Sequence, residues 1–211
     1  MNNSVSSTAR LLGAGLRALL VLTALCGVLY PLAVTGIAQA AFPDRANGSR
    51  IEDSGGRVVG SALIGQRYGG DLRWFQPRPS AGLSANTENT RYGLLVSGAS
   101  NKAADNPDLI AAVAGARARV LADNTVPGYT PQPSWVPADA VTSSGSGLDP
   151  HISPAYAELQ VHRVAERNGL AVRQVETLVR DHTEGRTLGF LGEPRVNVLE
   201  LNTALRALAA P

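Results

Sequence analysis

Residues 18–38 read ALLVLTALCGVLYPLAVTGIA, a run of twenty-one residues without a charged side chain. Wound as an α-helix, such a run measures roughly 30 Å, which is the thickness of the hydrocarbon core of a bilayer. Pro31 lies inside the run and is expected to kink or weaken that helix. The stretch therefore predicts one transmembrane helix, residues 18–41, ahead of a larger body.

Basic residues set the expected direction of this helix. Arg10 and Arg17 precede it, and no acidic residue accompanies them. The positive-inside rule then places residues 1–17 in the cytoplasm and residues 42–211 outside it. A cleaved signal peptide is the alternative, because residues 38–40 (AQA) fit a cleavage pattern. A signal peptide's apolar region runs only about 7–15 residues, so an uncleaved anchor is favoured.

The rest of the composition excludes several classes of protein. The chain has nineteen Lys and Arg against seventeen Asp and Glu, so residues 42–211 hold seventeen of each sign. Nucleic-acid binding needs clustered positive charge and is disfavoured. Cys26 is the only cysteine, which excludes an intrachain disulfide and a cysteine-based zinc site. Lys102 is the only lysine, and no phosphate-binding loop ending in Gly-Lys-Ser/Thr occurs.

Residue patterning predicts that residues 42–211 form an α/β domain of mixed α+β type. The expected strands are 57–64, 94–97, 139–142 and 196–199, and the expected helices are 107–123, 154–168, 171–182 and 200–208. Asn106 and Ser153, each followed by proline, are expected helix caps, and Gly169 is expected to end the second helix. A proline-rich connector is expected over 126–137.

Three kinds of site can be weighed on these elements. The helix pair within 154–182 could be a helix-turn-helix, but its charges cancel, which favours a plain helical hairpin. His151, His162 and His182 lack the i, i+4 spacing of a zinc helix, so no metal site is expected.

A serine hydrolase is the remaining alternative. Ser144 or Ser146, with His151 and either Asp149 or Asp181, would supply the residue types of a catalytic triad. The G-x-S-x-G motif is absent, however, and a glycine- and serine-rich turn before a helix cap explains the same stretch.

Several distinctive blocks follow one another along the chain: YPLAVTGIAQ (30–39), GSALIGQ (60–66), FQPRPS (75–80), SGASN (97–101), VTSSGSGLDPHISP (141–154), HTE (182–184) and LGFLGEPRVNVL (188–199). In this order, and over residues 12–208, the chain resembles the C subunit of the Kdp potassium-transporting P-type ATPase. Ala99 departs from the glycine frequent in the family. The motif residues of unassigned role are Gln39, Gln66, Arg78, Ser97, Gly98, Ser100, Asn101, Gly145, Gly147, Asp149, His151, Glu193, Arg195 and Asn197. We expect 141–154 and 188–199 to pack the domain together or to face a partner, because glycine and proline suit fixed backbone geometry.

The resemblance implies an accessory, non-catalytic subunit of an ATP-driven, high-affinity potassium uptake complex in the bacterial cytoplasmic (inner) membrane. The implied partners are an ion-conducting multi-span subunit, a P-type ATP-hydrolysing subunit, a small hydrophobic subunit and the lipid bilayer.

The family description also makes this subunit a catalytic chaperone that raises the ATP affinity of the hydrolysing subunit, and it associates the family with nucleotide binding. A body outside the cytoplasm cannot touch cytosolic ATP. We therefore expect a role in assembly and coupling, with ATP and potassium handled by the complex and no cofactor bound directly. A membrane-anchored external hydrolase using a Ser/His pair is the alternative.

Overall fold

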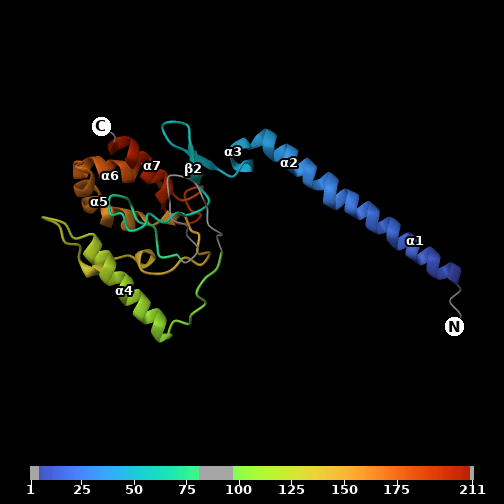
Figure 1. Ribbon diagram of the computed structural model, residues 1–211, viewed down its shortest axis with the longest axis horizontal. Helices are drawn as coiled ribbons and strands as arrows, with labels where there is room; N and C mark the ends of the chain where they lie inside the picture. The colour runs from blue at the N-terminus through green and yellow to red at the C-terminus, as the bar shows by residue number, and fades with distance from the viewer. Residues whose placement is uncertain (1–4, 81–96, 210–211) are drawn as a thin grey trace. The chain divides into compact units, whose positions relative to one another are not determined.

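The computed structural model describes residues 5–80 and 97–209 of the chain. The chain divides into two compact units, Met1–Ser49 and Arg50–Pro211 (Figure 1). Of the strand expected at 94–97, residues 94–96 lie outside the described residues, and Ser97 has irregular backbone.

The N-terminal unit is one long helical rod followed by a short helix. It consists of α1 (Val5–Leu22), a π-helical segment η1 (Thr23–Leu29), α2 (Tyr30–Ala41) and α3 (Pro43–Ala46). The continuous helix over Ser6–Ala41 is apolar and long enough to cross a bilayer, and none of its most apolar window is buried. It therefore begins well before residue 18, where the sequence placed its start.

Pro31 does not break this helix, because the backbone changes its hydrogen bonding just before the proline. Proline lacks an N–H and crowds the carbonyl four residues earlier. In η1 the helix widens to a π turn, and the Tyr30 N–H donates to the Leu25 carbonyl, five residues back. A π turn of this kind is one of the known ways in which a helix accommodates a local disruption.

The second unit begins with a two-stranded antiparallel sheet of β1 (Arg50–Glu52) and β2 (Val58–Ser61). The strand predicted at 57–64 is thus shorter, and β1 was not predicted. A Cβ atom on Gly60 would overlap the Gln66 amide and lie 2.6 Å from the Leu199 side chain. Gly60 therefore lets β2 approach the helix that contains Leu199.

Four α-helices are the longest elements in the described part of this unit, which we call the body. They are α4 (Pro107–Asp123), α5 (Pro154–Asn168), α6 (Val172–Asp181) and α7 (Val198–Ala209). The predicted caps are confirmed: Asn106 Oδ1 accepts the N–H groups of Asp108 and Leu109, and Ser153 Oγ accepts that of Tyr156. Gly169 ends α5 in the left-handed region with φ 65°.

A second sheet has the strand order β3-β5-β4 and is antiparallel throughout. Its strands are β3 (His151–Ile152), β5 (Arg195–Asn197) and β4 (Thr183–Glu184). The strand predicted at 196–199 therefore moves by one or two residues. It ends at Asn197 because that side chain accepts the N–H groups of Leu199 and Glu200 and so caps α7.

The strand predicted at 139–142 is wrong. Ala138–Ala140 forms a 3₁₀ turn, η3, and a second 3₁₀ turn, η2, spans Pro133–Trp135 within the proline-rich connector. The cause lies outside the local sequence, since the Asp139 carboxylate accepts both the N–H and the hydroxyl of Ser153. If residues 139–142 were an extended strand, the 3₁₀ turn that brings the Asp139 carboxylate to Ser153, at the start of α5, would be absent.

The core lies among α5, α6, α7 and β5, and side-chain amides tie the irregular chain before Ser80 to it. Val175 and Val179 of α6 are both buried in this core. Asn202 of α7 bonds both backbone groups of Phe75, accepting its N–H and donating to its carbonyl. Gln160 of α5 does the same for Gln76. The segment 71–80 thereby acts as a strap held across the helices.

Candidate functional site

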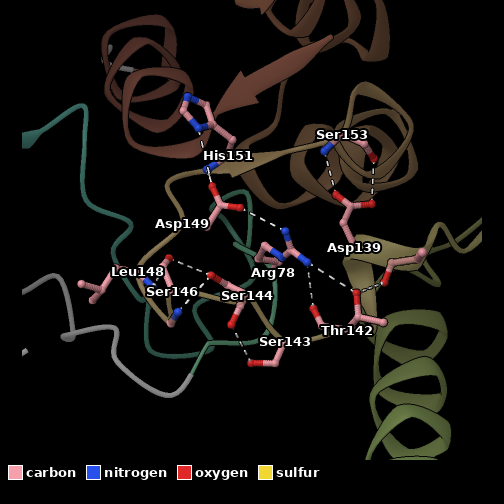
Figure 2. Close-up of polar contacts among 12 residues, drawn as sticks. Arg78, Asp139, Thr142, Ser143, Ser144, Ser146, Leu148, Asp149, His151 and Ser153 are labelled. Atoms are coloured by element: carbon pink, nitrogen blue, oxygen red, sulfur yellow. Dashed lines mark hydrogen bonds and ion pairs between the residues drawn. The ribbon is translucent and has the colours of Figure 1, made fainter. Parts of the chain in front are cut away.

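The centre of the motif-rich region is a turn that satisfies its own backbone (Figure 2). Ser144 is buried, and its Oγ accepts the Gly147 N–H at 3.0 Å. Ser146 Oγ accepts the Leu148 N–H at 3.1 Å, and the two hydroxyl oxygens are 3.1 Å apart. Gly147 has φ 71°, in the left-handed region that favours glycine. Both serines therefore serve to fix the turn.

An ion-pair network stands beside this turn. Arg78 of the strap donates to Asp149 Oδ2 at 3.0 Å, and Asp149 Oδ1 accepts the His151 backbone N–H at 2.9 Å. The His151 Nδ1 atom lies 3.6 Å from the same Oδ1. The side chain and N–H of His151, together with Arg78, hold the pKa of the Asp149 carboxyl at about 2, against a partial burial that acts the other way.

Other motif blocks, distant in sequence, meet at the same turn. The Ser146 carbonyl accepts the Gly98 N–H and the Ser97 hydroxyl. The Ser144 N–H donates to the Pro79 carbonyl. Three blocks that are separate in the sequence are therefore joined here, in line with the expectation that 141–154 helps to pack the domain. Ser100 and Asn101 lie on the exposed surface nearby.

The remaining motif residues lie apart from this network. Gln66 is buried and donates to the Val59 carbonyl, and Asn197 donates to the Ala62 carbonyl while it caps α7. Surface ion pairs join Arg186 to Glu193 and Glu184 to Arg195, each at 2.7 Å. Gln39 exchanges two amide hydrogen bonds with Asn47 inside the N-terminal unit. A Cβ atom on Gly145 would meet nothing within 4 Å.

The residues of the hydrolase alternative do not form a triad. A serine nucleophile needs a base within hydrogen-bond reach, about 2.6–3.2 Å. Figure 2 shows the His151 ring pointing away from Ser144 and Ser146, with the Asp149 carboxylate lying between them. Both hydroxyls are occupied by backbone N–H groups of the turn.

The other histidines are likewise engaged in local contacts. His162 stacks on Tyr129 with ring centroids 3.8 Å apart, and His182 Nδ1 lies 2.8 Å from the Leu178 carbonyl oxygen. Across residues 5–80 and 97–209, no group of three or more His, Cys, Asp or Glu side chains is arranged to hold a metal ion.

An exposed apolar hairpin includes the start of the block 188–199, which the sequence analysis expected to pack the domain together or to face a partner. Residues 185–192, which we call the apolar hairpin, form most of the connection between β4 and β5. Leu188, Phe190 and Leu191 are 79%, 68% and 50% exposed. The Thr187 and Leu191 backbones exchange two hydrogen bonds of 2.9 Å, which fix the turn that presents these side chains. In the sequence, these three apolar residues stand among glycines and are flanked by charged residues. This pattern is the signal of an exposed apolar turn.

Arg163 is a feature that the sequence reasoning missed. It lies on α5 and is only 1% exposed, although its charge was simply counted in the balance of charges over residues 154–182. Its guanidinium is held by the Asn124 and Gln160 side chains and by carbonyls of the strap region. The burial of Arg163 depends on that strap, which the local pattern of α5 does not reveal.

The whole chain is similar to known proteins of one family. A family model described as K+-transporting ATPase, c chain (KdpC), matches residues 12–207. The chain is 62% identical to the potassium-transporting ATPase KdpC subunit of Streptomyces avermitilis, over 100% of this chain and 99% of that one. The KdpC subunit of Streptomyces coelicolor is 60% identical, over 100% and 98%. That of Geobacter sulfurreducens is 48% identical, over 90% and 94%.

Proposed function

The chain belongs to the KdpC family of K+-transporting ATPase c chains, and on that premise we propose that it is the accessory, non-catalytic subunit of a bacterial ATP-driven, high-affinity potassium uptake complex. The observation that carries this proposal is similarity over the whole chain to subunits of that name. The partners are the ion-conducting multi-span subunit, the P-type ATP-hydrolysing subunit and the small hydrophobic subunit.

The proposed topology is a single pass through the cytoplasmic membrane. Residues 1–17 lie in the cytoplasm, residues 18–41 span the bilayer, and residues 42–211 form the external domain. The exposed apolar surface of the N-terminal helix supports this arrangement, because leucines such as Leu20 and Leu32 are 60% and 65% exposed in the isolated chain. Apolar side chains such as these avoid the free-energy cost of contact with water when lipid or another membrane helix surrounds them.

The external domain couples to the ion-conducting subunit and caps its entrance. The apolar hairpin is the contact element, since Phe190 and Leu188 are exposed side chains of the type that dominates protein interfaces. The network around Arg78 and Asp149 fixes the backbone beside the turn at 141–154, and the motif residues act as positioning residues rather than as catalytic ones.

Raising the ATP affinity of the hydrolysing subunit, if this chain does so, is then an indirect effect. With the external domain across the membrane from ATP, only residues 1–17 and the span reach the cytoplasmic side. Any influence on ATP therefore travels through subunit packing, which is a coupling between two sites in the sense of linked equilibria.

Purification in mild detergent from native membranes tests the assignment to the complex. We expect the chain to co-purify with a multi-span subunit and a P-type ATPase subunit. If the chain migrates alone, without either partner, the proposed function fails.

A photoreactive ATP analogue in sealed right-side-out vesicles tests the route to ATP. The analogue is supplied either inside or outside the vesicles, and labelling of the chain is measured. Labelling of the external domain only with outside analogue agrees with the topology and counts against a physiological contact. Labelling of residues 42–211 by analogue confined inside the vesicles would overturn the topology.

A further inference from the structure

A cavity of about 410 Å³ in the body has an unusual concentration of positive charge. It is bounded by α4, α5 and the chain around the strap, and its charged lining residues are Arg67, Arg78, Arg119, Arg163 and Asp123. Residues 42–211 carry equal numbers of basic and acidic side chains, so this excess is local. A wall with four cations and one anion creates a positive potential that attracts negative ligands.

Arg163 forms the deepest charge of this wall and has no carboxylate partner among the described residues. Its bonds go to neutral oxygens: Asn124 Oδ1 at 2.9 Å, Gln160 Oε1 at 2.6 Å, the Trp74 carbonyl at 2.9 Å and the Leu72 carbonyl. A guanidinium has five N–H donors, so these four bonds leave one free. Burial lowers the pKa of Arg163 to about 10, and the side chain stays charged at neutral pH.

Two more polar atoms of the lining residues are buried without a partner in the described part of the chain. They are Arg78 Nε and Ser80 Oγ. Buried donors are normally satisfied, and an unsatisfied one calls for an explanation such as a bound ion or ligand. The other edge of Arg78 is already paired with Asp149, so the guanidinium is oriented before any ligand arrives.

We infer that this cavity is an anion-binding site for a phosphate monoester or inorganic phosphate. Four arginines against Asp123, with one arginine already balanced by Asp149, leave two formal positive charges. A dianionic phosphate neutralises both. Guanidinium groups also match the oxygen geometry of phosphate better than other cations do.

Charge, rather than stacking, selects this ligand. Among the described residues that line the cavity, Tyr156 is the only aromatic one, and it is 4% exposed. A nucleobase would therefore find no open ring on this wall. The same phosphate chemistry has two sources outside the cytoplasm, the free ion and the headgroup of phosphatidic acid. The inference does not depend on the proposed function, because the cavity lies entirely within the body.

Titration of the full chain with inorganic phosphate tests the site. The chain is placed in phosphatidylcholine nanodiscs, and binding is measured by calorimetry at constant ionic strength with chloride as the competing anion. We expect saturable binding of one phosphate and a rise in the thermal unfolding midpoint. Absence of saturable binding overturns the inference.

An exchange of one exposed arginine locates the binding. Arg119→Gln removes a charge from the cavity wall at an exposed position of α4, and should weaken phosphate at least about tenfold. Arg173→Gln makes the same change at an exposed position of α6 away from the cavity, and should leave affinity unchanged. Unfolding midpoints without phosphate verify that both variants fold. Equal affinities in the two variants would overturn the site.

Nanodiscs that contain phosphatidic acid separate the two sources. If the headgroup occupies the cavity, the apparent phosphate affinity falls in these discs, and Arg119→Gln abolishes that difference. If the free ion is the ligand, the affinity is the same in both lipids. Both results support the phosphate site, whereas a fall that persists in Arg119→Gln would show that the lipid acts elsewhere and would overturn the headgroup as occupant.

Discussion

The turn at 141–154 and the apolar hairpin at 185–192 use the same backbone device for opposite purposes. Each contains a glycine in the left-handed region, Gly147 with φ 71° and Gly189 with φ 82°. In the first, Ser144 is 1% exposed and its Oγ accepts the N–H of Gly147 within the same turn. In the second, Phe190 is 68% exposed. The difference teaches that the side chains, and not the backbone, decide whether such a turn is complete alone or needs a partner.

The two segments therefore differ in what they contribute to the isolated body. In the turn at 141–154, which we call the serine turn, the serine hydroxyls accept backbone N–H groups. Burying these N–H groups without a partner would be costly. Leaving Leu188 or Phe190 in water forgoes the roughly 1.5–3 kcal/mol that full burial of one such side chain supplies. The apolar hairpin thus gains little from folding and much from contact with another surface.

The largest expected effect follows from changing the tip of the apolar hairpin. Phe190→Asp places a charge where we propose contact with the ion-conducting subunit. Loss of a central aromatic contact typically costs 2 kcal/mol or more, so recovery of partner subunits should fall at least about tenfold. The measurement is quantitative co-purification from native membranes.

A matched control keeps this result interpretable. Leu63→Asp makes the same kind of change at a side chain that is 64% exposed but outside the apolar hairpin. It should leave co-purification unchanged, and neither variant should alter the unfolding midpoint of residues 50–211. Equal losses in both variants would contradict the apolar hairpin as the contact element.

A smaller effect should come from the backbone of the serine turn. Gly147→Ala puts a Cβ atom on a residue with φ 71°, where L-residues are disfavoured by about 1–2 kcal/mol. We expect the free energy of unfolding of residues 50–211 to fall by that amount in urea titration. Gly145→Ala is the control, because Gly145 has open space around it and no positive φ. Similar losses in both would show that this turn does not depend on the left-handed glycine.

The sequence predicted best where the cause is local. Asn106, Ser153 and Gly169 act as caps through bonds to residues within a few positions, and each was predicted. The strands β1, β3 and β4 span only two or three residues and exist only through pairing with another strand. No periodicity can emerge in so short a segment, so these strands could not be predicted.

The site shows the same division. The sequence singled out the block 141–154 as important. It could not show that Ser97 and Gly98 contact this block, because that contact depends on how the chain between them folds back. The 139–142 error has this origin too, because Asp139 bonds Ser153, fourteen residues away. Arg163 is the extreme case: nothing near it in the sequence announces that the strap buries it.

A comparable loss, dependent on pH, is expected for the ion pair beside the serine turn. Asp149→Asn removes the charge that Arg78 and His151 stabilise. The pKa of Asp149 is lowered from 3.8 to about 2, so the folded state gains stability above the unfolded pKa. With 30% of the side chain exposed, solvent reduces this gain to about 1–2 kcal/mol.

The direction in which the stability contributed by Asp149 changes with pH determines what to measure. The gain is fully present at neutral pH and is lost as pH falls from about 4 toward 2, because unfolding then takes up a proton at Asp149 and acid favours the unfolded state. Urea midpoints of residues 50–211 for wild type and Asp149→Asn should differ at pH 7 and converge in acid. A difference that stays constant over this range would mean that the carboxylate charge is not the source of the stability.

The smallest expected effect concerns the charged base of the apolar hairpin. Glu193→Gln breaks the 2.7 Å ion pair with Arg186, whose two side chains are 44% (Arg186) and 77% (Glu193) exposed. Exposed pairs contribute about 0–1 kcal/mol, and salt screens them further. We expect less than about 0.5 kcal/mol of lost stability and no change in co-purification, since the backbone bonds between Thr187 and Leu191 remain. If Glu193→Gln lost partner subunits as Phe190→Asp does, charge rather than apolar contact would drive docking, and the contrast between the two turns would have to be redrawn.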